Sequence, residues 1–237
     1  MTVLTVCNRK GGTGKTTTVV NLARYLSLAN HSVLVVDLDS QGHVNQGFGG
    51  VASAQSPWQC DEALSEHNDW PRLTLCQIAD DESFDSVRFI TWLHQVKARF
   101  QHVIIDTPPT NDEALNTAVR VSDALLVPFA ATPLGVAGVH QLTRLFMKVA
   151  AAYNPDLRLI GLLPTMFDRR LNIHQQVVTS MRAEYGEKRV LRPIRSNIKL
   201  AEAFSAHLPI YDYAKDCTGA MDYQLLADEI SALWGQA

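Results

Sequence analysis

Residues 10–17 combine glycine, lysine and threonine in a pattern suited to binding phosphate. Their sequence is Lys-Gly-Gly-Thr-Gly-Lys-Thr-Thr, and they lie directly between an apolar run and a segment with helical periodicity. Glycines let successive N–H groups point inward, and the start of the following helix adds positive potential. Lys15 can reach the β- and γ-phosphates of a nucleotide, and the Thr16 hydroxyl is placed to ligate Mg²⁺. The residues expected to bind the nucleotide are Lys10, Gly11, Gly12, Thr13, Gly14, Lys15, Thr16 and Thr17.

This loop departs from the ordinary phosphate-binding pattern G-x-x-x-x-G-K-[ST]. That pattern would place glycine at position 9, where this chain has Arg9, and here an extra lysine, Lys10, precedes the paired glycines. The alternative is a glycine-rich turn that binds nothing, and the strand–loop–helix setting weighs against it.

Carboxylates follow two other apolar runs. Asp37 and Asp39 end the first, and Asp106 ends the second. Ligands of open parallel sheets bind beyond the carboxyl ends of the strands, and residues two apart are expected on the same side of a strand. One carboxylate can hold metal-bound water and another can position the attacking water. The alternative is that Asp37 or Asp106 only caps the next helix.

The elements that must position these groups alternate along the chain. Strands are predicted at 2–7, 32–37, 102–106, 124–129 and 157–163, and helices after the first strand and at 84–100, 134–152, 173–185 and 221–234. The strands are continuously apolar, as expected when helices cover both faces of a sheet. Residues 42–81 are less regular and are expected to hold loops and short helices. The pattern predicts an α/β fold, a doubly wound, mostly parallel sheet flanked by helices, as one domain over residues 1–237.

Three segments, residues 10–17, 35–42 (Val-Val-Asp-Leu-Asp-Ser-Gln-Gly) and 103–110 (Val-Ile-Ile-Asp-Thr-Pro-Pro-Thr), resemble the ParA/MinD family of deviant-Walker positioning ATPases. The resemblance extends over nearly the whole chain, and residues 162–170 and 197–204 are more similar to ParA than to MinD proteins. It implies ATP and Mg²⁺ as cofactors, an ATP-dependent sandwich homodimer, and slow ATP hydrolysis stimulated by DNA and by a cargo adaptor protein.

The resemblance also implies roles for individual residues. Lys10 matches the signature lysine that reaches across to the partner's nucleotide phosphates. Lys15 matches the phosphate-binding lysine, and Thr16 matches the Mg²⁺ ligand. Asp39 matches the acidic residue needed for hydrolysis, and Asp106 matches the Walker B aspartate. The expected catalytic residues are therefore Lys10, Lys15 and Asp39, and the expected metal site is Thr16, Asp39 and Asp106. A cation supplied by a second copy would couple dimerisation to charge stabilisation at the γ-phosphate.

The distribution of charge bears on nucleic acid. With 21 basic and 24 acidic residues the net charge is −3, which by itself argues against a protein that coats DNA. Residues 158–199, however, hold nine basic and three acidic residues, whereas residues 200–237 hold six acidic residues and one lysine. Such a basic segment predicts salt-sensitive, sequence-independent binding of double-stranded DNA. The N-terminus lacks a signal-type apolar core, so we expect a cytoplasmic protein, and the ParA resemblance implies that it associates with the nucleoid. The alternative is an ordinary solvated basic surface.

The expected DNA contacts are Arg192, Arg195 and Lys199. ParA relatives often have Pro-Arg-Asn at this place, where the arginine contributes to DNA binding. This chain has Arg195-Ser196-Asn197 instead, so the role must rest on neighbouring residues.

The closing helix bears on membranes. Residues 221–234 have an apolar face but carry Asp222, Asp228 and Glu229 and no lysine or arginine. An anionic membrane would repel this helix, so we expect it to pack on the body of the protein.

The four cysteines have no metal-like spacing and are expected to be incidental thiols.

Two functions remain open from the sequence. The first is a DNA-bound ATPase that segregates or positions a plasmid, a chromosome or a protein cargo, with a McdA-like role in carboxysome positioning as one candidate. The second is a biosynthetic ligase or ATPase of the same phosphate-loop superfamily, such as a dethiobiotin-synthetase-like enzyme, with no DNA role. Stimulation of ATP hydrolysis by nonspecific DNA would distinguish them.

Overall fold

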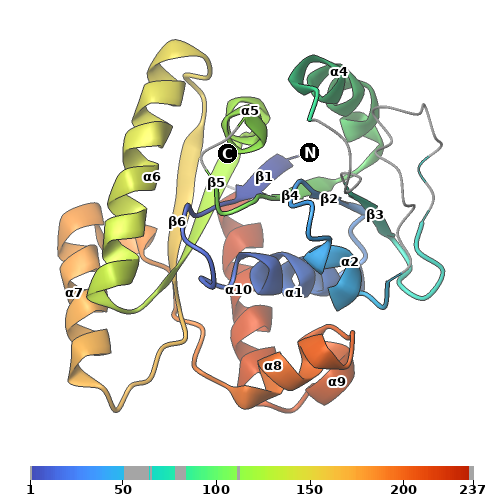
Figure 1. The fold of residues 1–237 in the computed structure, drawn as a ribbon. Helices are drawn as coiled ribbons and strands as arrows, with labels where there is room; N and C mark the ends of the chain where they lie inside the picture. Colours follow the sequence, from blue (N-terminus) through green and yellow to red (C-terminus); the bar gives the residue numbers. More distant parts are fainter. Residues whose placement is uncertain (1, 51–63, 65, 78–83, 111–112, 235–237) are drawn as a thin grey trace.

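A six-stranded parallel sheet forms the centre of the molecule in the computed structural model, which describes residues 2–50, 64, 66–77, 84–110 and 113–234 (Figure 1). The strand order is β3-β2-β4-β1-β5-β6. The strands are β1 (Thr2–Val6), β2 (Val33–Asp37), β3 (Leu73–Gln77), β4 (His102–Asp106), β5 (Ala124–Ala130) and β6 (Arg158–Thr165). The predicted fold class is confirmed, with every strand pair parallel.

Helices cover both faces of this sheet. They are α1 (Lys15–Leu28), α2 (His43–Gly47), α4 (Ser86–Val96), α5 (Glu113–Val121), α6 (Pro133–Ala152), α7 (Asn172–Tyr185), α8 (Ile198–Ser205), α9 (Ile210–Ala214) and α10 (Thr218–Trp234), with short 3₁₀ helices η1 (Lys97–Arg99) and η2 (Glu187–Arg189). Figure 1 shows α1 and α10 on one face, with α8 and α9 beyond them, and α4 and α5 on the other. Helices α6 and α7 lie beside β5 and β6.

The continuous apolar strands are explained by this two-sided packing. In β2, Val33 and Val35 join the core beneath α1 and α10, whereas Leu34 and Val36 join the core beneath α4. All four side chains are fully buried. Because neighbouring strand residues point to opposite faces, a strand covered on both sides has no position for a polar alternation.

The prediction for residues 42–81 is wrong at residues 73–77. These form β3, an edge strand that pairs with β2 along its full length, from Val33 beside Leu73 to Asp37 beside Gln77. The expected short helix is present as α2. Residues 51–63, 65 and 78–81 of that region lie outside the described residues. Helices α5, α8 and α9 were not predicted individually.

The closing helix α10 packs on the body of the protein, as the sequence predicts, and its partner there is α1. The Tyr25 hydroxyl donates to the Ala220 carbonyl oxygen over 2.7 Å, and the Tyr223 hydroxyl lies 3.4 Å from Thr18 Oγ1. Leu226 and Ile230, on the apolar face, are buried in the same core. Within the described ranges, no helix is long and apolar enough to cross a membrane.

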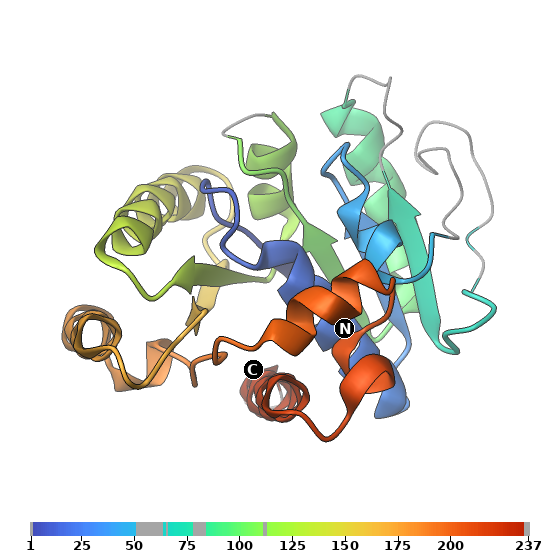
Figure 2. The same cartoon turned by 60° about the horizontal axis from the view of Figure 1, so that its bottom comes forward.

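Residues 190–196 run beside β6 and bring the chain back towards the carboxyl ends of the strands. Leu191 N–H donates to Leu162 O over 3.0 Å, and Ile194 N–H donates to Pro164 O over 2.9 Å. Gly161 makes room for this segment, since a Cβ there would lie only 2.4 Å from Leu191 Cδ1. The segment therefore delivers residues 194–197 to the same edge of the sheet as residues 10–17 (Figure 2).

A histidine at the opposite end of the sheet makes folding stability depend on pH. His102 opens β4, its ring stacks on Trp234 with centroids 4.3 Å apart, and its Nε2 lies 3.2 Å from His31 Nδ1. Burial, followed by the charge of His31, lowers the pKa of His102 to about 4 from 6.5. In the unfolded chain His102 therefore binds a proton as the pH falls through about 6.5, whereas in the folded chain it does so only near pH 4.

We predict that folding stability decreases as the pH falls from about 6.5 to about 4. Thermal melts across this range should give a steadily lower Tm for the wild type and a shallower dependence for His102→Gln. His94→Gln is the matched control, because His94 is exposed on α4. Equal slopes for the wild type and His102→Gln would contradict the assignment.

Candidate functional site: a phosphate loop at the carboxyl ends of the strands

The predicted phosphate-binding loop lies between β1 and α1, at the carboxyl edge of the sheet. Gly12 and Gly14 have φ angles of 69° and 82°, in the left-handed region that favours glycine. Gly14 also caps α1, and its carbonyl oxygen accepts the first helical hydrogen bond from Thr18 N–H at 2.9 Å. A buried bond of 3.0 Å from Thr165 Oγ1 to Thr13 O ties the loop to the end of β6. These contacts give the loop the curl that the sequence predicts.

Lys15 is turned into the loop that contains it. Its side chain is buried, and its Nζ lies 3.4 Å from the Lys10 carbonyl oxygen. Burial lowers the pKa of Lys15, whereas the charges of Asp106 and Asp39 act in the opposite direction. A buried cation at the mouth of curled N–H groups is a suitable contact for phosphate oxygens.

Thr16 and Asp106 meet at the end of β4. The Thr16 hydroxyl donates to Asp106 Oδ2 over 2.7 Å, and Asp106 Oδ1 accepts from Thr107 N–H at 3.1 Å. Burial raises the pKa of Asp106 to about 7, although the Thr16 hydrogen bond and Lys15 oppose the rise. A hydroxyl and a carboxylate in contact are the oxygen ligands that Mg²⁺ prefers beside a nucleotide phosphate. The residues present therefore fit a magnesium ion bound together with phosphate.

Asp37 and Asp39 differ in position and in contacts, contrary to the expectation that both lie on the same side of a strand. β2 ends at Asp37, whose carboxylate is buried and accepts from Asp39 N–H at 2.9 Å and from Val44 N–H at 3.1 Å. Burial and the charge of Asp106 raise the pKa of Asp37 well above its usual value. Gly42 is the N-cap residue of α2, and Asp37 binds an N–H group in the first turn of that helix, which is a structural role close to the capping alternative considered for it. Asp39 lies beyond the strand, is half-buried, and acts electrostatically on Lys15 and Asp106.

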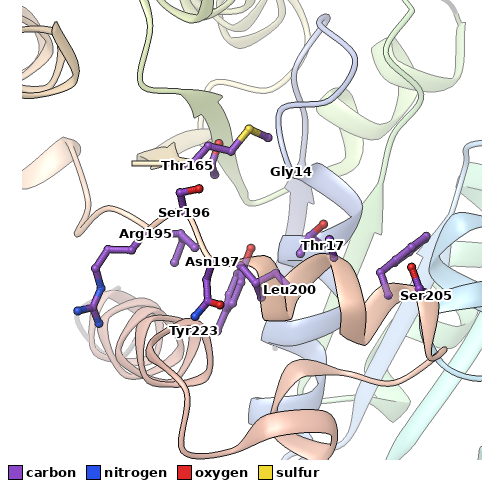
Figure 3. A pocket seen from close by; sticks show the side chains of 13 residues that line it. Gly14, Thr17, Thr165, Arg195, Ser196, Asn197, Leu200, Ser205 and Tyr223 are labelled. Atoms are coloured by element: carbon purple, nitrogen blue, oxygen red, sulfur yellow. The ribbon is translucent and has the colours of Figure 1, made fainter. Parts of the chain in front are cut away.

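A pocket of about 430 Å³ opens beside the loop, and sequence reasoning did not find it (Figure 3). Its lining is mostly apolar and comes from four parts of the chain. The lining residues are Gly14, Thr17, Thr165, Met166, Ile194, Arg195, Ser196, Asn197, Leu200, Ala201, Phe204, Ser205 and Tyr223. Figure 3 shows Tyr223 and Leu200 directed towards the loop residues Gly14 and Thr17. The only sequence signal was the family-like segments at 162–170 and 197–204, which no local pattern places together.

The three expected DNA contacts lie in unequal surroundings. The Arg195 guanidinium forms an ion pair with Asp222, with Nη2 2.6 Å from Oδ1, and the Asp222 side chain is only 4% exposed. Figure 3 shows the Arg195 side chain directed away from the pocket, over α10. Lys199 Nζ lies 2.8 Å from Glu202 Oε2. Arg192 is exposed. Two of the three positive charges are thus balanced by a neighbouring carboxylate.

Comparison with known proteins identifies a nucleotide-binding family. A model of the CobQ/CobB/MinD/ParA nucleotide binding domain matches residues 4–210. The chromosome-partitioning ATPase Soj of Thermus thermophilus is 33% identical over 236 residues, covering 97% of this chain and 95% of Soj.

Two solved structures share the fold. One is cobyrinic acid a,c-diamide synthase from Mycobacterium smegmatis, solved with a bound ATP analogue and magnesium. It is 27% identical to this chain, the TM-score is 0.79, and the match covers 99% of this chain and 96% of the synthase chain. An ATP complex of a McdA variant from Cyanothece is 18% identical with a TM-score of 0.82, covering 99% of this chain and 96% of that one, which shows likeness of fold alone.

The match over residues 4–210 lies on the elements that build the loop, its carboxylates and part of the pocket. The relative at 33% identity extends the likeness over nearly the whole chain. This chain therefore belongs to the CobQ/CobB/MinD/ParA nucleotide-binding family, as a ParA-type member.

Proposed function

We propose that this chain is an ATPase that forms an ATP-dependent sandwich homodimer, binds double-stranded DNA without sequence preference, and segregates or positions a cargo. An adaptor on the cargo stimulates ATP hydrolysis and thereby releases the dimer from DNA. The observation that supports this most strongly is the different placement of the two lysines in the phosphate loop, Lys15 and Lys10.

Lys15 serves the nucleotide of its own chain, whereas Lys10 is available to a second chain. The ammonium of Lys15 is buried against the Lys10 carbonyl oxygen. The ammonium of Lys10 forms neither a hydrogen bond nor an ion pair with any residue that the structure describes, and its side chain is half-buried. A cation brought in by the partner would stabilise charge that develops on the transferring phosphoryl group.

The pocket beside the loop is suited to the base of the nucleotide. It shares Gly14 and Thr17 with the phosphate loop, so a nucleotide whose phosphates occupy the loop would extend its base into the pocket. Ligand pockets of this size are generally apolar with a few polar groups. Here Leu200, Phe204 and Tyr223 provide the apolar surface, and Ser196 and Asn197 provide polar groups.

The carboxylates have separate parts in hydrolysis. Thr16 and Asp106 would hold Mg²⁺, which would neutralise charge on the phosphates. Asp39, half-buried and near Lys15, orients the attacking water and accepts its proton. ATP and Mg²⁺ as cofactors agree with the family and with the ATP analogue and magnesium found in the M. smegmatis relative.

Replacing Lys10 tests the trans role. We expect Lys10→Ala to bind ADP and ATP with affinities close to wild type, because Lys15 and the loop N–H groups remain. It should not form the ATP-dependent dimer, because the cation at the partner's phosphate is missing. Light scattering with MgATP measures the dimer, and Lys15→Ala is the matched control that should lose nucleotide binding as well. Normal dimerisation of Lys10→Ala would rule out the trans mechanism.

The DNA contact is proposed to centre on Arg192, with Lys188 and Arg189 of η2. All three are exposed, and none forms an ion pair with a described residue. They stand close in sequence, on the segment that joins η2 to the stretch beside β6. Arg195, by contrast, neutralises the buried Asp222, so reversing its charge would place a second negative charge against a buried carboxylate and confound the experiment.

We predict that Lys188→Glu/Arg189→Glu/Arg192→Glu loses retention on nonspecific double-stranded DNA while ATP-dependent dimerisation persists. Each phosphate contact removed should reduce the slope of log affinity against log salt by about 0.9. Lys215→Glu is the matched control, because Lys215 is an exposed lysine in the acidic carboxyl-terminal segment. Unchanged DNA retention of the triple variant at low salt would refute this surface.

A biosynthetic enzyme remains the second candidate. The observation in its favour is the 27% identity, over nearly the whole chain, to the M. smegmatis cobyrinic acid a,c-diamide synthase that was solved with a bound ATP analogue and magnesium. Such an enzyme has no use for a lysine directed at a partner's nucleotide. Stimulation of ATP hydrolysis by nonspecific DNA would support partition, and its absence would favour the enzyme.

The cargo is better proposed as DNA than as protein. The relatives with 30% identity or more include Soj of T. thermophilus and the chromosome partitioning protein ParA of Caulobacter vibrioides. The carboxysome role suggested by the sequence gains no support, because McdA shares only 18% identity and therefore the fold alone.

A further inference from the structure

We infer that Asn8 is a positioning residue for Lys10: its side chain fixes the start of the phosphate loop so that Lys10 faces the partner's nucleotide. This inference rests on the proposed function. Asn8 is a neutral polar residue that is fully buried between the loop and β5. None of the chemistry assigned above uses it.

The Asn8 carboxamide takes over a hydrogen bond that the sheet would otherwise make. Cys7 N–H donates to Leu126 O at 3.0 Å, the last bond by which the chain after β1 follows β5. In a regular parallel pair the next such donor would come two residues later and would reach Pro128 O. The chain turns away there, and Asn8 Nδ2 donates to Pro128 O at 2.8 Å instead. The loop can therefore leave the sheet without stranding a buried carbonyl oxygen.

The other end of the same carboxamide holds Lys10. Asn8 Oδ1 accepts from Lys10 N–H at 3.1 Å, an Asx turn that reverses the chain within two residues. The Lys10 carbonyl oxygen is held in turn by Lys15 Nζ and by Thr13 Oγ1, both at 3.4 Å. The backbone of Lys10 is thus fixed on both sides, and its side chain is left without a described partner.

Helix α6 closes around the carboxamide. A Cβ on Gly138 would lie 3.0 Å from Asn8 Oδ1, which is tighter than most Cβ contacts, so the carboxamide would have to move by a few tenths of an ångström. Glycine at position 138 leaves the Asn8 carboxamide undisturbed. The chain therefore offers a way to displace the Asn8 side chain without changing its chemistry.

The variants separate the two bonds. Asn8→Ala removes both. Asn8→Asp keeps an acceptor for Lys10 N–H but places a carboxylate oxygen against Pro128 O, which has no proton to share. Gly138→Ala keeps the carboxamide and pushes it from the α6 side. Thr5→Val is the matched control, because it deletes a buried hydroxyl on β1 that contacts Ser122 Oγ at 2.6 Å, away from the loop.

The test compares ADP affinity with ATP-dependent dimerisation and turnover. We expect Asn8→Ala and Gly138→Ala to keep ADP affinity within about threefold of wild type. Dimerisation and the turnover number should fall by about tenfold or more, the effect of losing one well-placed hydrogen bond at a critical group. Thr5→Val should match them in Tm loss without the defect in turnover. Asn8→Ala/Lys10→Ala should be no worse than Lys10→Ala, because both changes remove the same interaction.

Several results would overturn the inference. Additive losses in the double variant, or a loss of ADP affinity as large as the loss of turnover, would mean that Asn8 supports the loop generally. Normal dimerisation of folded Gly138→Ala would also overturn it, and this variant decides the matter if Asn8→Ala does not fold. If Lys10→Ala itself dimerises and turns over ATP as the wild type does, the proposed trans role of Lys10 is wrong. If Lys10→Ala fails to dimerise but Asn8→Ala dimerises normally, only the role of Asn8 is wrong.

Discussion

The phosphate loop depends on hydrogen bonds from strands that lie beside it in the sheet but far from it in sequence. Pro128 of β5 holds Asn8 at the start of the loop, and Thr165 of β6 holds Thr13 near its end. Glycines make the curl possible, yet an unsupported glycine-rich segment would lose much of its conformational advantage to entropy. The order β4-β1-β5-β6 is therefore a requirement of the site, because it places both supports on the correct side of β1.

The same edge of the sheet gathers the remaining groups. Thr16 and Asp106 meet because β1 and β4 are neighbours in register, Val6 beside Asp106. The pocket beside the loop forms because residues 190–196 return along β6 and α10 packs on α1. The ion pair between Arg195 and Asp222 links those two segments, so we interpret it as part of the pocket wall. The positive charge of Arg195 is therefore used to neutralise Asp222 within the fold and is less available to bind DNA.

Local patterns made part of this architecture predictable. Residues 10–17 and the strand ending at Asp106 were identified from type and spacing, since a strand–loop–helix unit is encoded within a few residues. The edge strand β3 was missed because Leu73–Gln77 stands in an irregular region and is stabilised by its pairing to β2. Asp37 and Asp39 look equivalent in sequence and differ only because the strand ends between them. The pocket and the Arg195–Asp222 pair join residues distant in the chain, which no local window contains.

The central claim is that Lys15 acts in its own chain and Lys10 acts in the partner's. It is tested most directly by mixing Lys10→Ala with Asp39→Ala and measuring ATP turnover. In the mixed dimer, the Asp39→Ala protomer supplies Lys10 to a site that retains Asp39, so turnover should appear although each variant alone is inactive. If Lys10 serves its own nucleotide, both sites of the mixed dimer lack a required group. Turnover that stays at the level of the separate variants would then contradict the account.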